Sequence, residues 1–355
     1  MNGTFAVTNP GANTSTITNA TPASGEDQIT VTFAAGTASE MTLNIPLPTG
    51  DYDDVYITPV CSSTKVAAAR HIKAGGYTAT RARGRQLTAT LVSFTVSSTE
   101  KVIFSPGNLW ATNTTANSTE GWVWTFASHQ YDIVGSNPAN TTVGSGLTTS
   151  PGTIDLFGWV GNSSSFTGAA QYGINNSSTD VDYGNNRADV LKADWASLVI
   201  SGYPANFWST PSKGVYDYLR DNRSTTNSLS PGARYTLATI NSIRGIIIFP
   251  DVYTHPSDVT VGGSPVYNAN SNCTATISST SDWDKMEAAG AVFLPAAGLR
   301  NGTELFNTKY GNYWMRESYG DGDYQAYYFG FGGDGIGTWG VTRRIGRSVR
   351  LVREL

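Results

Sequence analysis

The chain has 355 residues, of which 14% are charged, and a net charge of −4. This length predicts about two domains, because single hydrophobic cores rarely grow beyond roughly 250 residues. The negative net charge and the lack of a basic stripe argue against nucleic acid as a partner. The sequence has no run of about 20 apolar residues, so we predict no membrane-spanning helix.

The start of the chain, Met1-Asn2-Gly3-Thr4, leads directly into polar, β-like sequence without a signal peptide. Such a start fits a cytoplasmic protein or the mature segment of a secreted one. The many Gly, Thr, Ser and Asn residues favour the second interpretation, an extracellular or cell-surface protein. Cys61 and Cys273 lie too far apart for a metal knuckle and form no disulfide framework.

Residues 1–96 have the pattern of an all-β domain. Apolar and polar residues alternate over 28–33, 41–45, 54–59 and 86–92, which predicts half-buried strands. Gly, Pro and Asp clusters separate them, and no helical pattern competes. We expect a small β-sandwich.

Two phrases of this domain, IPLPTGDY at 45–52 and IKAGGY at 72–77, resemble the fimbrillin-like domains of bacterial pili. The resemblance covers most of residues 1–96. It implies attachment to a pilus or to the cell surface, with other pilus subunits as partners. A generic adaptor sandwich is the alternative for the same pattern.

The second domain is predicted at 97–355. Its first apolar strand, 102–104, and its last, 349–352, lie at the two ends of the domain, and pairing them would bring its termini together. Helices are predicted from Thr210 to Asn222 and over 281–290, the latter with Ser281 as N-cap and Gly290 as stop. Buried strands are expected at 245–250 and 291–295, so the domain class is α+β.

The segment 311–355 has the composition of a binding loop, with Tyr, Trp and Gly among small polar residues. Within AYYFGF at 326–331, alternation would place Tyr327, Phe329 and Phe331 on a core face. Tyr328 and Gly330 would point the other way, toward a face that is free to vary.

Several ordered phrases of the second domain resemble bacterial surface domains with the C-type lectin fold, a family that includes the variable proteins of diversity-generating retroelements. They are KVIFSPGNL at 101–109, DLFGW at 155–159, AAGAVFLPAAG at 288–298, NYW at 312–314 and GRSVRLV at 346–352. The resemblance implies a ligand-binding face built from variable positions on a constant scaffold, here within 311–347. In that family Asn codons are rewritten at adenines, which can produce Tyr, Gly, Asp, Ile, Val, Thr or Arg but not Met or Glu. Met315 and Glu317 therefore depart from the pattern.

The predicted ligand-binding positions are those that would point outward between the scaffold residues. They are Tyr319, Asp321, Asp323, Tyr328, Gly330, Gly332, Asp334, Ile336, Trp339, Val341, Thr342, Arg344 and Ile345. Arg343 and Arg350 are instead expected to tie strand ends into the scaffold. Trp122, Trp124, Trp159, Trp195 and Trp283 are expected to be core or loop anchors.

Catalysis is not predicted. The three histidines stand in unrelated contexts, no Gly-x-Ser-x-Gly elbow accompanies them, and Cys273 is not one of a cysteine pair as an oxidase of this fold would need. Asp321 and Asp323 could chelate Ca²⁺, as could a looser set of Asp180, Asp182 and Asn185, but neither has the spacing of a calcium loop. Solvated turns are the expected alternative, so we predict no cofactor.

The predicted function is that of a bacterial surface or pilus-tip adhesin whose partner is a protein or glycan on another cell. A phage receptor-binding protein could use the same fold, but would normally carry tail-fibre sequence. A structural pilus subunit would use the second domain as bulk, and would have no use for a polar binding face.

Overall fold

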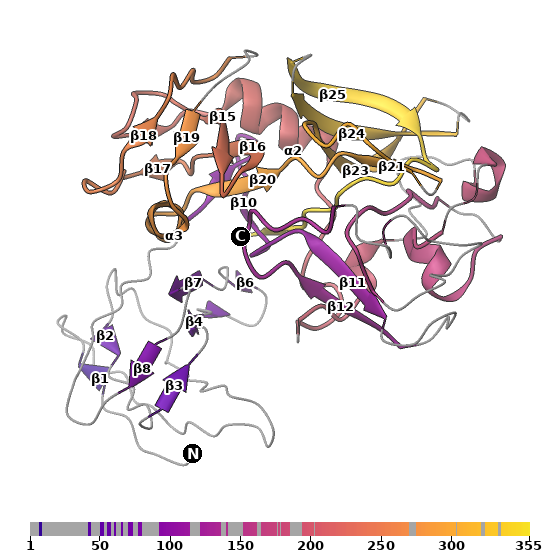
Figure 1. Ribbon diagram of the computed structural model, residues 1–355, viewed down its shortest axis with the longest axis horizontal. Helices are drawn as coiled ribbons and strands as arrows, with labels where there is room; N and C mark the ends of the chain where they lie inside the picture. Colours follow the sequence, from indigo (N-terminus) through magenta and orange to yellow (C-terminus); the bar gives the residue numbers. More distant parts are fainter. Residues whose placement is uncertain are drawn as a thin grey trace.

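The computed structural model describes residues 92–113, 121–135, 140, 152–161, 165–175, 177, 179–184, 194–201, 203–269, 275–302, 304–320, 324–332 and 335–355, with the backbone of strands β1 to β8 before them. Strands predominate over helices in this part of the chain (Figure 1). No helix among the described residues is long and apolar enough to cross a membrane. The predominance of strands makes the described part of the chain β-rich.

The strands before residue 80 form short antiparallel pairs: β1 with β2, β3 with β8, β4 with β7 and β5 with β6. Two of them, β2 and β4, fall inside the predicted strands at 41–45 and 54–59; the strand at 28–33 and most of that at 86–92 lie outside the described residues. The bounds are β1 Val7–Thr8, β2 Thr42–Leu43, β3 Gly50–Tyr52, β4 Val55–Ile57, β5 Val60–Cys61, β6 Lys65–Val66, β7 Arg70–Lys73 and β8 Tyr77–Ala79.

One small sheet joins the two ends of the part of the chain that follows residue 92, which we call the larger body. The pairing of its first and last predicted strands is confirmed. β10 (Lys101–Phe104) pairs antiparallel with β26 (Val352–Glu354), so that Phe104 lies opposite Val352. On its other side β10 pairs with β9 (Phe94–Thr95). Phe94 is buried in the same core as β10, so this body begins before the predicted boundary at 97.

The remaining sheets of this body are small, apart from one of five strands in the order β18-β19-β15-β16-β20. Its strands β16 and β20 match the predicted buried strands at 245–250 and 291–295. The five-stranded sheet consists of β18 Val261–Gly262, β19 Ala275–Ile277, β15 Tyr235–Ile240, β16 Ile243–Ile248 and β20 Val292–Pro295. The others are β12-β11-β13 (Trp122–Phe126, Leu109–Asn113, Gly152–Ile154), β14-β17 (Thr226–Asn227, Val252–Tyr253), β21-β22 (Leu299–Asn301, Glu304–Phe306) and β23-β24-β25 (Gly311–Tyr319, Gln325–Gly332, Gly335–Thr342). Short 3₁₀ turns span Gly168–Tyr172, Asp180–Tyr183 and Trp195–Ser197.

Two helices begin at serine N-caps. Ser212 caps α2 (Lys213–Asp217), which continues as a π-helical turn over Tyr218–Asn222, within the predicted range. For α3 (Thr280–Ala288) the predicted cap Ser281 is wrong: Ser279 has the extended backbone of an N-cap and accepts a hydrogen bond from the Asp282 N–H. Gly290 follows the end of α3 with φ +101°, which favours glycine.

The sheet β23-β24-β25 separates two hydrophobic cores. The first core holds Tyr313, Met315, Phe329 and Phe331 together with the five-stranded sheet and α2 and α3. The second core holds Trp314 and Ala326 with the β11–β12 hairpin and the segment before β26. Successive residues of β23 thus enter different cores, because side chains alternate between the faces of a strand. The expectation that one face of this sheet is free is therefore wrong over the part covered by the second core.

The expected anchoring residues are placed as predicted. Trp124, Trp159, Trp195 and Trp283 are buried, and Trp122 packs against the second core. The buried Arg350 donates to the Gln130 side chain at 2.9 Å. The guanidinium of Arg343, also buried, lies 4.7 Å from the centre of the Trp159 ring. Both arginines thus belong to the scaffold.

Asp155 gives a test of this packing. Its carboxylate is fully buried and accepts hydrogen bonds from the Val134 N–H and the Asn140 side chain, both at 2.8 Å. Burial raises the pKa of Asp155 to about 6. Between roughly pH 4 and pH 6 the folded state then binds more protons than the unfolded state, so stability falls as the pH rises, by on the order of 3 kcal/mol.

The measurement is urea unfolding of the wild type and of Asp155→Asn over this pH range. We expect the difference between their free energies of unfolding to change between pH 4 and pH 6 and to be constant above it. A difference that is independent of pH would contradict the assignment. The comparison also removes the opposite contribution of carboxyls such as Asp221, whose pKa is lowered by its hydrogen bond with Arg220.

Candidate ligand-binding face

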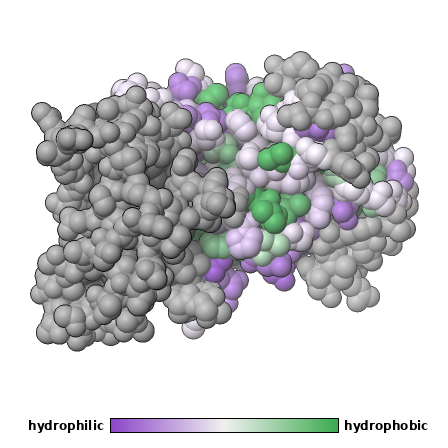
Figure 2. All heavy atoms as spheres, turned by 90° about the horizontal axis from the view of Figure 1, so that it is seen from below, coloured by the Kyte–Doolittle hydropathy of each residue, from purple (hydrophilic) through white to green (hydrophobic). Residues whose placement is uncertain are grey.

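Exposed aromatic side chains gather at the last sheet. Of the four large aromatic side chains that are exposed in the described part of the chain, Tyr319, Tyr324 and Trp339 lie on or beside β23-β24-β25, and Phe306 lies on β22. Seen from below relative to Figure 1, apolar atoms of the described residues form only small, separate spots (Figure 2). Scattered spots of that kind are normal on a protein surface.

Trp339 lies on the edge strand β25 and is 42% exposed. Its ring covers Gly330 and Gly337, which are paired across β24 and β25. A Cβ atom added to either glycine would approach the ring to 2.8 Å. The two glycines therefore form a floor that lets the indole lie close to the sheet.

Tyr328 pairs directly with Trp339, and their ring centres are 5.8 Å apart. The guanidinium of Arg347 lies over the Tyr328 ring, 3.7 Å from its centre, and 5.4 Å from that of Trp314. Arg347 also donates to the side chain of Asn312. A continuous series of contacts thus connects exposed Trp339 to the second core.

Burial lowers the pKa of Arg347 to about 10, against the opposing effect of Tyr328. The guanidinium therefore stays charged at neutral pH, and its contact with the Tyr328 ring is a cation–π interaction. Because Arg347 is held by the core, it fixes the position of Tyr328. We call the surface formed by Tyr328, Gly330, Gly337 and Trp339 the Trp339 face.

The opposite side of the same sheet carries a second aromatic pair. The rings of Tyr319 and Tyr327 meet edge-on at 4.9 Å, and the Tyr319 ring lies over Gly340. Lys213 from α2 places its ammonium 5.5 Å from the Tyr327 ring centre. Since Gly340 follows Trp339 on β25, this pair lies on the other face of the sheet.

The predicted site residues therefore do not form one surface. Tyr328, Gly330 and Trp339 come together, whereas Tyr319 lies across the sheet. Val341 packs against the second core, and Thr342, half-buried, is paired with Gln325 at the end of the strand. Gly332 is buried beside the Tyr310 ring. Asp321, Asp323 and Asp334 lie outside the described residues.

Three other predicted positions serve the scaffold. Ile336 is only 4% exposed because it lies opposite Phe331 and enters the first core with it. Ile345 is 8% exposed. Their assignment to a ligand-contacting surface is wrong, because both side chains are packed inside. Arg344 is half-buried and paired with Asp180 at 3.2 Å.

Gly337 of the Trp339 face and Arg347, which supports that face, were not predicted as part of a site. Arg347 lies in the predicted scaffold phrase GRSVRLV, and no role was predicted for Gly337. Placing Gly337 under the ring requires the register of β24 and β25, which pairs Gly330 with Gly337. The glycine-rich sequence Gly332-Gly333-Asp334-Gly335 was the available signal for that register.

The chemistry of this region is that of a contact surface. Within the described ranges, no group of three or more His, Cys, Asp or Glu side chains is arranged to hold a metal ion. Comparison with protein-family models, with curated proteins and with solved structures gives no match to the chain. The Trp339 face is therefore the feature of the described residues from which a function can be inferred.

Proposed function

We propose that the chain is a bacterial surface or pilus-tip adhesin that binds a protein or glycan on another cell through the Trp339 face. The observation that carries the proposal is the exposed Trp339 ring, held over two glycines beside Tyr328. Trp and Tyr dominate the energetics of binding surfaces, because they offer a large contact area at a low cost in conformational entropy.

Preorganisation supports the same proposal. Tyr328 is fixed by the buried Arg347, and Trp339 stands on a strand that is paired along its length with β24. A ligand that packs against these rings would therefore immobilise few free rotors, which favours affinity. A functional surface on rigid strands is also more accurate in its geometry than one on loops.

We further propose that the larger body is a C-type-lectin-like domain with a diversified C-terminal face, and that the N-terminal region is a fimbrillin-like domain that contacts other pilus subunits at the cell surface. The pairing of β10 with β26, which joins the two ends of the predicted domain, supports this interpretation. A reverse transcriptase gene beside a near-copy of the 3′ end that differs at adenines would support diversification. Neighbouring DNA without these elements would contradict it.

Replacing Trp339 by Ala tests the binding proposal. The full chain is applied to arrays of glycans and of extracellular proteins, and each ligand found is titrated. We expect Trp339→Ala to lower affinity at least tenfold, as for a buried aromatic hot spot.

The matched control is Phe306→Ala, which removes an aromatic side chain of similar exposure, 40%, from β22. It is expected to leave affinity unchanged. If every ligand binds Trp339→Ala as tightly as the wild type, the proposed face is wrong.

A further inference from the structure

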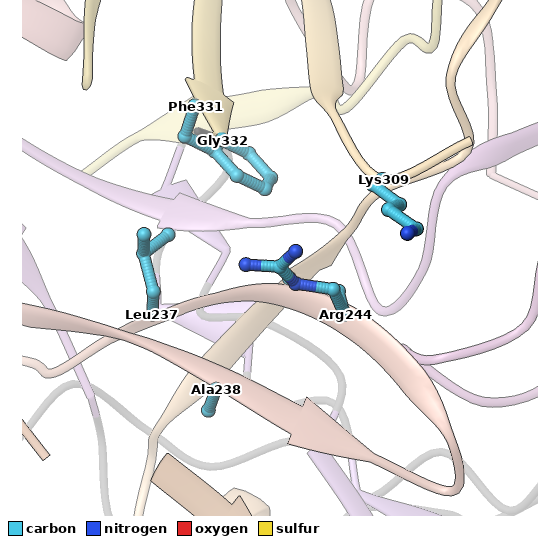
Figure 3. Close-up of a pocket in the computed structure, with 7 residues that line it drawn as sticks. Leu237, Ala238, Arg244, Lys309, Phe331 and Gly332 are labelled. Carbon is cyan, nitrogen blue, oxygen red and sulfur yellow. The ribbon is translucent and has the colours of Figure 1, made fainter. Parts of the chain in front are cut away.

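A small cationic pocket lies where the end of β24 meets the β15–β16 hairpin (Figure 3). Its free volume of about 10 Å³ is close to that of a single water-sized group. Only the end group of a ligand can therefore enter. The pocket is lined by Leu237, Ala238, Arg244, Gly245, Lys309, Phe331 and Gly332.

The backbone that carries Arg244 is fixed on both sides. Asn241 and Ser242 have φ angles of 48° and 67°, as in the tight turn of a two-residue hairpin. Arg244 then pairs with Thr239 on β15, and its carbonyl accepts a hydrogen bond of 2.7 Å from the Ala296 N–H. The base of its side chain is therefore held in a defined place.

Lys309 comes from a separate segment. It stands in the turn that precedes β23, which is closed by a 2.8 Å hydrogen bond from the Tyr310 N–H to the Asn307 carbonyl. Figure 3 shows the Arg244 guanidinium directed beneath Phe331, with Lys309 on the neighbouring side of the pocket. Two cations from distant parts of the sequence are thus brought to one apolar-walled pocket.

These two cations have no carboxylate within salt-bridge distance among the described residues. Lys101, Lys213 and Lys285, in contrast, each lie within 4 Å of an aspartate. Arg244 and Lys309 place two positive charges at one pocket. This contrasts with the whole chain, whose net charge is −4. Neighbouring like charges are favourable only with a counter-ion, and the walls formed by Leu237 and Phe331 strengthen the attraction by reducing contact with water.

We infer that this pocket is an oxyanion-binding site that accepts a terminal carboxylate, sulfate or phosphate group. The planar fork of Arg244 can donate two parallel hydrogen bonds to such a group, while Lys309 adds a point charge. The site is distinct from the Trp339 face, because Phe331 points to the first core and Trp339 lies on the opposite side of the sheet.

The test is a titration of the isotopically labelled full chain in low-chloride buffer, separately with acetate, sulfate and phosphate. The signals followed are the Arg244 Nε–H and the backbone N–H groups of Gly245 and Gly332. We expect saturable shifts at these groups. The anion with the highest affinity distinguishes a planar carboxylate from a tetrahedral oxyanion.

Arg244→Gln is expected to weaken binding about tenfold and Lys309→Gln about threefold. Arg244→Lys keeps the charge without the fork and should be intermediate. The control Arg220→Gln removes the same charge from a residue that is paired with Asp221, and should have no effect.

Absence of a saturable shift would overturn the inference, as would equal binding by the wild type and Arg244→Gln. Equal weakening by Arg220→Gln would also overturn it, since the effect would then be one of net charge. Lys309 is exposed in a turn, so its variant does not depend on a core contact. This test is independent of the proposed function. If the Trp339 face does not bind a ligand, the anion affinities of the pocket are unchanged.

Discussion

Replacing Trp314 by Ala is expected to lower the free energy of unfolding by about 3–5 kcal/mol. The indole is fully buried in the second core, and its N–H donates to the Phe157 carbonyl at 2.6 Å. Its removal would leave a cavity between β23 and the segments around Phe157, and the Phe157 carbonyl would keep only the hydrogen bond from the Arg347 N–H. It would also remove a surface against which Arg347 packs.

Urea unfolding of the full chain measures this loss, with Trp339→Ala as the matched control. The same substitution at Trp339, which is 42% exposed, should cost less, because a large part of that indole already lies in water in the folded state. Trp314→Phe should recover part of the loss by filling most of the cavity. Equal destabilisation by the two alanine variants would contradict the placement of Trp314 in the core and of Trp339 on the surface.

Replacing Gly330 by Val is expected to abolish most ligand binding, by about 100-fold, while the chain stays folded. A Cβ atom at Gly330 would approach the Trp339 ring to 2.8 Å and the Tyr328 ring to 2.9 Å. Both rings would have to leave their positions, so the effect should exceed that of Trp339→Ala. The obstacle is formed by the far ends of two side chains rather than by backbone, and valine is favourable in strands, so the chain should stay folded, at the cost of the contact between Tyr328 and Arg347.

Gly262→Val is the control for this substitution. An added Cβ there meets only the Thr276 carbonyl, at an ordinary 3.4 Å, on β18 of the five-stranded sheet. We expect binding equal to that of the wild type. If Gly330→Val keeps its affinity in titrations with a ligand found on the arrays, the two rings are not the contact surface.

The sequence pattern predicted the parts of the fold that depend on local periodicity. The core positions of Phe329 and Phe331 and the strands β16 and β20 follow from alternation or apolar runs, whereas α2 is capped by Ser212, two residues after the predicted start at Thr210. The pairing of β10 with β26 was also correct, since two apolar strands at the ends of a domain have few other partners.

The errors concern information that is not local. Alternation separates two faces of β24, but it does not reveal that a second core covers part of the other face. Ile336 was assigned to the ligand-binding set because its residue type fits the variable pattern of the resembling family, whereas β25 is paired with β24 so that Ile336 faces the first core with Phe331. The contribution of Arg347 depends on a contact with Tyr328 that only the assembled structure provides.

The most direct test of the account is a footprint of a bound ligand on the full chain, obtained by transfer of saturation from the ligand to the amide and indole N–H groups of the protein. We predict the largest effects at Tyr328 and the indole of Trp339, with no effect at Phe306. A footprint that leaves Trp339 unaffected and lies instead on β11–β12 or on the five-stranded sheet would contradict the proposed binding face.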